Sequence, residues 1–185
     1  MAILKSNINP KSSSFLKNKE AMETLVAELE KQLAKTREQG DEKHRLRAKK
    51  SGKFLARERV ELLLDQDSFF LELLPLAGLE EKGGFGVGGT IVTGIGLVQG
   101  KLTLINANIG TLKGGSFDYS TLKKVLRIND IAFENRLPVI TIVESGGANL
   151  TDQDKVFNYG GTMFRELTRR SKAGIPSIAI VTGNA

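Results

Sequence analysis

Residues 139–150 read Val-Ile-Thr-Ile-Val-Glu-Ser-Gly-Gly-Ala-Asn-Leu, a β-branched run that ends in a pair of glycines. The run follows Pro138 and predicts a short strand buried on both faces. The glycine pair would let main-chain N–H groups approach a ligand closely, because no Cβ blocks the path. If a helix begins after Asn149, two or three N–H donors would point at one spot, where an oxyanion could rest. An ordinary strand-to-helix turn is the alternative interpretation, since short glycine motifs are weak signals.

A second block of sequence repeats this pattern. Residues 174–184 align with residues 136–146: in each, a helix end is followed by a Pro turn, a buried strand and a small-residue exit. Strand, helix and strand of this composition predict an α/β fold with a right-handed parallel crossover. The two strand exits should therefore lie side by side, and each could offer backbone donors to a crevice at the carboxyl ends of the strands.

Upstream residues predict an antiparallel hairpin. Residues 91–98 and 102–107 are apolar and β-branched and are joined at Gln99-Gly100. Gly94 and Gly96 inside the first strand indicate close backbone packing or a bulge. The glycine-rich residues 82–89 precede strands instead of opening a helix, so a Rossmann dinucleotide site is excluded and a lead-in loop is expected.

A second glycine turn, Lys113-Gly114-Gly115, follows the hairpin. A lysine beside two glycines can hold an anion, although a surface turn explains it equally well. Ser120 is the predicted N-cap of a helix that runs to Asn135. A polar loop over residues 151–154 and a helix ending near Ala173 should complete the crossover.

The N-terminal segment is predicted to be an amphipathic helix. Apolar residues recur at three- and four-residue spacing within residues 19–39, and Gly40 follows as a stop. One apolar stripe needs a partner, so we expect this helix to pack on the main body or on a second subunit. The sequence thus divides into residues 1–50, an N-terminal helix with a basic segment, and residues 51–185, the main domain.

Composition excludes several classes of protein and site. With 185 residues, 40% hydrophobic and 26% charged, the chain has the composition of a globular protein. No apolar run could span a membrane or act as a signal peptide, so we expect a cytoplasmic protein, or a mitochondrial-matrix protein in a eukaryote, with no membrane partner. The absence of cysteine excludes disulfides and thiolate-ligated zinc, and we expect no metal.

The net charge of +6 comes from one segment. Residues 43–59 hold eight Lys or Arg and one acidic residue, while the rest of the chain is nearly neutral. Such a segment could bind the phosphates of a polynucleotide or of a coenzyme, or it could be a solvated or partner-facing surface. Only one aromatic residue, Phe54, interrupts it, so we expect no nucleic-acid partner.

Six blocks of sequence, in order, resemble the carboxyltransferase (β) subunits of biotin-dependent acyl-CoA carboxylases of the methylcrotonoyl-CoA and propionyl-CoA type. The resemblance covers nearly everything from His44 onward. The blocks are residues 52–65, 68–72, 92–96, 113–115, 134–138 and 145–148. Asn149-Leu150 looks like the methylcrotonoyl/geranyl branch, whereas Ile109-Gly110 stands where such relatives usually show Asp-Ala, which leaves the acyl group open.

The resemblance implies a crotonase-like (ClpP/crotonase) N-domain, here incomplete, that binds acyl-CoA and stabilises its enolate while a carboxyl group passes from carboxybiotin. Biotin would be carried in trans by a biotin carboxylase/biotin carrier subunit, and the full-length protein would be a homo-oligomer. The matching residues are, for the backbone oxyanion hole, Gly146, Gly147 and Ala148, and, for substrate binding, Lys113, Gly114, Gly115 and Ser145.

The family chain continues beyond the point corresponding to Ala185 with a second glycine-rich loop and a C-domain. We therefore expect this polypeptide alone to lack carboxyltransferase activity. Two further interpretations stay open. One is a structural or assembly fragment without chemistry. The other is a serine hydrolase using Ser145, although no glycine stands two residues before the serine and the single histidine, His44, lies far away in sequence.

Overall fold

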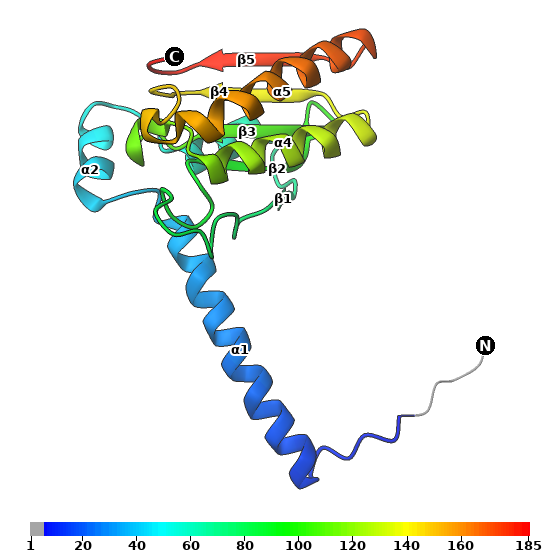
Figure 1. Ribbon diagram of the computed structural model, residues 1–185. Coiled ribbons are helices and arrows are strands. Elements are labelled where there is room, and N and C mark those ends of the chain that lie inside the picture. The colour runs from blue at the N-terminus through cyan, green and yellow to red at the C-terminus, as the bar shows by residue number, and fades with distance from the viewer. Residues whose placement is uncertain (1–5) are drawn as a thin grey trace.

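The computed structural model describes residues 6–185. A single five-stranded sheet has its strands in chain order, and helices pack on both of its faces (Figure 1). The helices are α1 Ser13–Arg37, α2 Glu42–Lys50, α3 Ala56–Leu63, α4 Tyr119–Glu134 and α5 Gln153–Lys172; the strands are β1 Phe70–Glu72, β2 Ile91–Val98, β3 Lys101–Asn108, β4 Val139–Val143 and β5 Ser177–Val181; two short 3₁₀ turns are η1 Lys113–Gly115 and η2 Leu150–Asp152.

The sheet is mixed, as the sequence predicts. Strands β1, β2 and β3 pair antiparallel, whereas β3, β4 and β5 pair parallel. The β2–β3 hairpin closes between Val98 and Lys101, and α5 makes the crossover between β4 and β5. Because β3, β4 and β5 run in the same direction, their carboxyl ends meet at one edge of the sheet.

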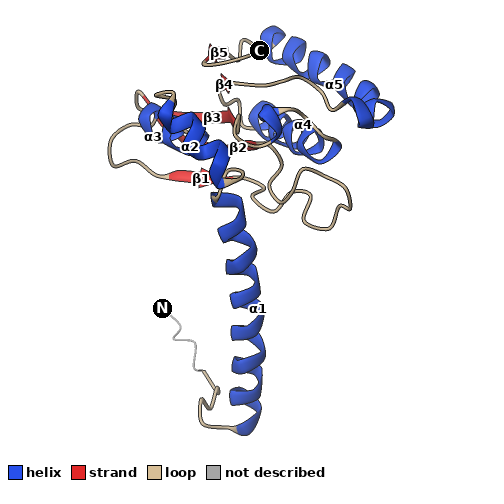
Figure 2. Ribbon diagram, turned by 90° about the vertical axis from the view of Figure 1, so that its left-hand side faces the viewer, coloured by secondary structure: helices blue, strands red, loops and turns tan. Residues whose placement is uncertain are grey.

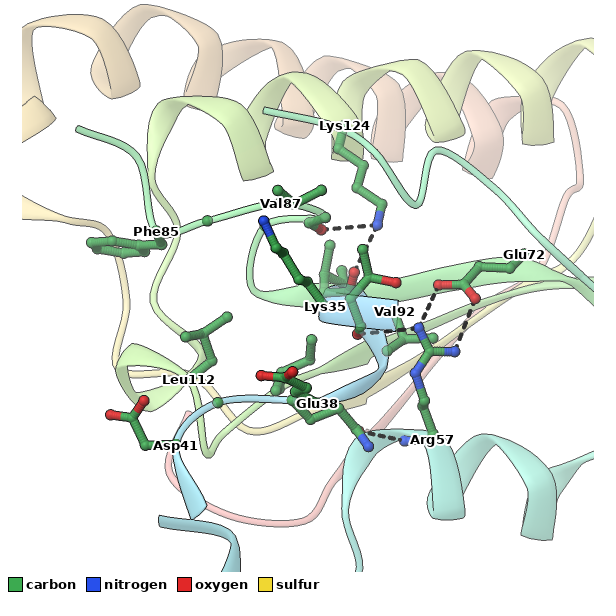
Figure 3. Close-up of a pocket in the computed structure, with 18 residues that line it drawn as sticks. Lys35, Glu38, Asp41, Arg57, Glu72, Phe85, Val87, Val92, Leu112 and Lys124 are labelled. Atoms are coloured by element: carbon green, nitrogen blue, oxygen red, sulfur yellow. Dashed lines mark hydrogen bonds and ion pairs between the residues drawn. The ribbon is translucent and has the colours of Figure 1, made fainter. Parts of the chain in front are cut away.

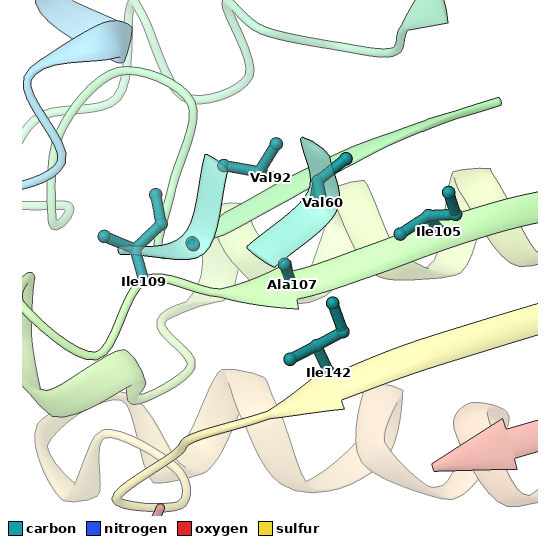
Figure 4. Packing of buried hydrophobic residues seen from close by; sticks show 7 residues of the cluster. Val60, Val92, Ile105, Ala107, Ile109 and Ile142 are labelled. Carbon is teal, nitrogen blue, oxygen red and sulfur yellow. The ribbon is translucent and has the colours of Figure 1, made fainter. Parts of the chain in front are cut away.

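Two apolar clusters cover the two faces of the sheet. On one face Val60 of α3 packs against Ile105 of β3 and Ile142 of β4, within the cluster drawn in Figure 4. On the other face Ile128 of α4 packs against Leu104. Neighbouring residues of β3 therefore point to opposite faces, which is the alternation expected of a strand.

The glycines inside β2 allow close packing and do not form a bulge. A Cβ added at Gly94 would lie 2.5 Å from the Leu71 carbonyl oxygen, and one added at Gly96 would collide with the Leu64 side chain. Pairing with β3 continues through both glycines without interruption. The absence of side chains here lets β1 and the end of α3 lie directly against the strand.

Helix α1 forms as predicted but does not lie on the main body. It projects away from the sheet and touches it only through its C-terminal end, where Thr36 is the helix's single buried residue (Figure 2). Apolar residues of the stripe stay exposed, with 59% of Met22 and 66% of Leu25 open to solvent. The prediction that this helix packs against the main body is therefore wrong, because the helix axis leads outward. Packing against a second subunit stays a prediction.

Two helix starts also differ from expectation. The N-cap of α4 is Asp118, not Ser120: the Asp118 carboxylate accepts a hydrogen bond from the Thr121 N–H at 2.8 Å, while the Ser120 hydroxyl donates to that carboxylate. Downstream, η2 takes up part of the predicted polar loop, and α5 then begins at Gln153. Asp and Ser are comparable N-caps, but the Asp118 carboxylate also accepts a hydrogen bond from the Phe85 N–H, a partner that the local sequence does not reveal.

Candidate functional site

The exits of β4 and β5 lie side by side, as the sequence repeat predicts. The Ser145 N–H donates to the Asn184 carbonyl at 2.7 Å, and the Thr182 N–H donates to the Val143 carbonyl at 2.9 Å. These bonds carry the parallel pairing one step beyond the strands. The two exits therefore satisfy part of each other's backbone instead of leaving every N–H free for a ligand.

The two glycine turns singled out in the sequence meet at this edge. The Gly146 N–H donates to the Gly114 carbonyl at 2.8 Å, and the Ser145 hydroxyl donates to the Gly115 carbonyl at 2.9 Å. Lys113 lies in the same turn, with its ammonium 5.9 Å from the centre of the Phe85 ring. The structure thus brings together the residues expected to bind substrate.

The three N–H groups of the expected oxyanion hole are not equivalent. The Gly146 N–H donates to the Gly114 carbonyl, and the Gly147 N–H donates to the Ser145 hydroxyl at 3.1 Å. Phe117 bridges the residues on either side of Ala148, so the Ala148 N–H points away from that bridge. Within residues 6–185 it has no acceptor. The loop itself is exposed. In this conformation the Gly146 and Gly147 amides already have internal partners, whereas the Ala148 amide is available; the three-residue oxyanion hole stays a prediction.

Ser145 is held as a structural hydroxyl. It donates to Gly115 and accepts from Gly147, so both of its hydrogen-bonding roles close the loop. His44 lies on α2, where its Nδ1 is 3.9 Å from the Asp41 carboxylate. No hydrogen bond joins Ser145 and His44 in the described part of the chain. This arrangement does not provide the serine–histidine pair of a hydrolase.

A cavity of about 400 Å³ opens between α2 and the strand exits. We call it the basic cavity. Its charged and polar lining comes from α2, from the start of α3 and from the ends of β3 and β4, and comprises His44, Arg47, Ser51, Lys53, Arg59, Thr111 and Glu144. Three cations and one carboxylate give this wall a net positive charge, which suits a ligand with phosphate groups.

Glu144 is the acidic member of this wall. Its Oε1 lies 2.7 Å from the Lys53 ammonium and its Oε2 lies 2.6 Å from the Arg59 guanidinium. Burial raises the pKa of Glu144, but the hydrogen bonds from Lys53 and Arg59 outweigh burial and leave that pKa below its usual value. The carboxylate is therefore ionised at neutral pH, and two cations of the basic segment are already paired.

A second cavity, of about 330 Å³, lies under the C-terminal end of α1 and the glycine-rich loop (Figure 3). Arg57 spans it to Glu72 with two hydrogen bonds of 2.9 and 2.7 Å. Lys124 of α4 closes another side, where its ammonium donates to the carbonyls of Gly88 and Ile91. The loop of residues 82–89 is thus tied to α4, also through the Phe85 N–H to Asp118.

Lys124 is almost fully buried, and burial is the main reason that its pKa falls to about 8. Glu72 acts in the opposite direction and Arg57 lowers the pKa further. A buried ammonium bonded only to carbonyls is costly. The Lys124 ammonium nevertheless anchors the loop that contains Gly88, because it also binds the first residue of β2.

Sequence reasoning identified the basic segment and the glycine turns but missed the pairing of Glu144 with Lys53 and Arg59. The position of Glu144 directly after a strand was the available signal, because ligands of α/β sheets bind at the carboxyl ends of the strands. Among residues 6–185 no group of three His, Cys, Asp or Glu side chains could hold a metal ion. In the same residues no helix is long and apolar enough to cross a membrane.

Comparison with known proteins decides the family. The profile of the family described as "Carboxyl transferase domain" matches residues 47–185. This chain belongs to the carboxyl transferase family. The resemblance noted in the sequence and the crotonase-like α/β fold expected from it are confirmed.

Individual relatives of this carboxyl transferase chain are carboxylase β subunits. It is 48% identical over 99% of its length to a Mycobacterium tuberculosis protein named "Probable biotin-dependent acyl-coenzyme A carboxylase beta2 subunit". It is 40% identical over its full length to the mitochondrial methylcrotonoyl-CoA carboxylase beta chain of Arabidopsis thaliana. It superposes on the β subunit of Pseudomonas aeruginosa geranyl-CoA carboxylase with a TM-score of 0.87 and 38% identity over 95% of the chain.

The chain spans about a third of each of these relatives: 34%, 32% and 33% of their lengths. One of them is named as biotin-dependent. The two cavities described above are lined largely by charged side chains and glycine backbone. Both cavities also have apolar lining residues, among them Phe54 in the basic cavity and Val92 in the other. This mixed lining does not assign biotin a place among residues 6–185.

Proposed function

We propose that this carboxyl transferase chain binds an acyl-CoA at the carboxyl ends of β3, β4 and β5 and stabilises the enolate of the thioester. The observation that carries this proposal is the exposed Ala148 N–H, which has no acceptor in the described part of the chain and belongs to the same β4 exit as the Glu144 wall of the basic cavity. A fixed backbone donor can stabilise a developing oxyanion by about 3 kcal/mol. Proton abstraction and carboxyl transfer require groups that these residues do not supply.

The phosphates of the coenzyme would bind to α2. Lys53 and Arg59 share one carboxylate, Glu144, and Arg57 is paired with Glu72, so each of these cations already has a partner within the protein. Arg47 of α2 lines the basic cavity and forms none of the ion pairs found among residues 6–185. It is therefore the cation that we expect to contact a phosphate first, with His44 beside it.

Several parts of the proposal concern the longer protein. We infer that biotin is carried by a separate carboxylase or carrier subunit, that the complete protein is a homo-oligomer, and that this chain alone is inactive. The exposed apolar stripe of α1 supports an oligomer. We also infer residence in the cytoplasm, or in the mitochondrial matrix of a eukaryote. We further infer that the chain divides into residues 1–50, the N-terminal helix with the basic segment, and residues 51–185, the main domain.

Calorimetric titration of an acyl-CoA into the chain tests the proposal. Arg47→Ala should weaken binding about tenfold or more, because a hydrogen bond to a charged group contributes about 1.5–3 kcal/mol. Lys31→Ala on α1 is the matched control and should bind like the wild type. Equal affinities of the two variants, or no binding by the wild type, would contradict a coenzyme site in the basic cavity.

A second candidate function is a structural or assembly element without chemistry. It is favoured by the exposed apolar side chains of α5, where 74% of Phe164 is open to solvent. Sedimentation of the wild type and of Phe164→Lys tests this alternative. A concentration-dependent oligomer that Phe164→Lys disrupts, together with no affinity for acyl-CoA, would favour assembly over ligand binding.

A further inference from the structure

All three parallel strand exits converge on the side chain of Glu144. Gly110 follows β3 and Gly183 follows β5, so they flank Glu144, which follows β4. A Cβ added at Gly110 would lie 2.6 Å from Glu144 Cδ, and one added at Gly183 would lie 2.6 Å from Glu144 Cγ. The carboxylate side chain thus fills the space that two methyl groups would need.

The two carboxylate oxygens hold two different cations. Lys53 binds Oε1 and Arg59 binds Oε2, and Arg59 also donates to the Thr182 hydroxyl at 2.8 Å. Lys53 and Arg59 come from the segment around the start of α3, whereas Thr182 lies just beyond β5. Glu144 therefore fastens the basic segment to the exit of β4, and Arg59 extends the link to the exit of β5.

The backbone of Glu144 is fixed as firmly as its side chain. Its N–H lies 3.4 Å from the Asn108 side-chain oxygen, and its carbonyl packs so closely on Gly115 that a Cβ there would collide with it. The next residues form the loop that ends at Ala148. Movement of Glu144 would consequently alter both the wall of the basic cavity and the position of this loop.

We propose that Glu144 is a positioning residue, which holds Lys53 and Arg59 in the wall of the basic cavity and thereby sets its affinity for a phosphate-bearing ligand. Glycine at positions 110 and 183 leaves the space that the Glu144 side chain occupies. The identity of the ligand rests on the proposed function, whereas the placement of Lys53 by Glu144 does not.

The placement of Lys53 can be measured without any ligand. Brief reaction with limiting acetic anhydride, followed by mass spectrometry, gives the acetylation rate of each lysine. Lys53 in the wild type should react several-fold more slowly than Lys50 of α2, which forms no ion pair among the described residues. In Glu144→Gln, which keeps the shape and removes the charge, the Lys53 rate should rise toward that of Lys50. An unchanged Lys53 rate would overturn the proposal.

Titration with coenzyme A then separates positioning from mere folding. Removal of the Glu144 charge would by itself favour an anionic ligand, so a roughly tenfold weaker binding by Glu144→Gln would report the lost placement of Lys53 and Arg59. A purely structural role would lower the melting temperature and leave the affinity unchanged, and unchanged or tighter binding would overturn the proposal. If the wild type does not bind coenzyme A, the proposed function fails, and titration with inorganic pyrophosphate takes over as the affinity test for Glu144.

Paired variants keep the test valid if Glu144→Gln folds poorly. Gly110→Ala should displace the carboxylate and speed acetylation of Lys53. The same change in a Glu144→Asp background should have a smaller effect, because the shorter acid leaves room for the methyl group. Effects on the Lys53 rate that are equal in the two backgrounds would mean that Gly110 and Glu144 act independently, contrary to the proposal.

Discussion

Ile105 of β3 and Ile178 of β5 lie in the same row of the sheet, one on each side of Ile140. They point to the same face, yet Ile105 is fully buried and 53% of Ile178 is exposed. Helix α3 covers the face over β2, β3 and β4 but does not reach β5. The same residue type in the same register thus belongs to the core in one half of the sheet and to an open surface in the other.

The largest expected effect is the loss of the buried isoleucine. Ile105→Ala should lower the free energy of unfolding by about 2–5 kcal/mol, since it removes apolar contacts and leaves a cavity. Ile178→Ala, the matched change on the same row, should lower the free energy of unfolding by no more than about 1 kcal/mol, because this loss reflects strand propensity more than burial. Urea denaturation measures both. Similar losses would show that β5 is covered in solution and that the two halves do not differ.

A pH titration sharpens the comparison on the hairpin side, where Lys124 is buried. Because its pKa is about 8 in the folded chain and about 10.5 when exposed, the unfolded state binds more protons between these values, and stability should rise with pH across this window. Across this window the free energy of unfolding of the wild type should rise by up to about 3 kcal/mol relative to that of Lys124→Met.

The neighbouring Lys123 is the control for that measurement. The exposed contact with Glu81 raises the pKa of Lys123, so its small contribution to stability should be lost as the pH rises above its normal range. Lys123→Met should therefore change the pH dependence slightly and in the opposite direction. Parallel stability curves for the wild type and Lys124→Met would show that Lys124 is not buried as a cation.

A smaller effect is expected from adding one methyl group at two glycines. Gly110→Ala should destabilise the chain by about 1–3 kcal/mol, because the new Cβ meets the clamped Glu144 side chain. A Cβ added at Gly161 in α5 would have no described atom within 4 Å, so Gly161→Ala should stabilise the helix by about 1 kcal/mol. Thermal unfolding of the two variants distinguishes the packed strand exits from the open α5. Stabilisation by both would refute the close packing around Glu144.

Much of the fold could be predicted because its signals are local. The hairpin, the crossover and the amphipathic α1 follow from residue spacing, and both glycine turns follow predicted strands. What could not be predicted depends on tertiary contacts. The Asp118 cap also binds the Phe85 N–H, and Gly146 binds Gly114, so both features depend on partners distant in sequence. The outward course of α1 cannot be read from its own residue spacing.

The site shows the same limit. Residue types located the loop of Ser145 to Ala148, but only the structure separates its amides into engaged and available donors. Likewise, counting charges located the basic segment without showing that Lys53 and Arg59 are bound to Glu144. Pairing between segments about ninety residues apart leaves no periodic pattern in the sequence.

The most direct test is amide NMR of the labelled chain during titration with an acyl-CoA and with its thioether analogue, which lacks the thioester oxygen. The Ala148 amide signal should shift with the thioester much more than with the thioether, while the Gly146 signal, fixed on Gly114, should respond little to either. An Ala148 signal that is insensitive to the thioester oxygen while residues of the basic cavity respond would contradict the enolate-binding role of this loop.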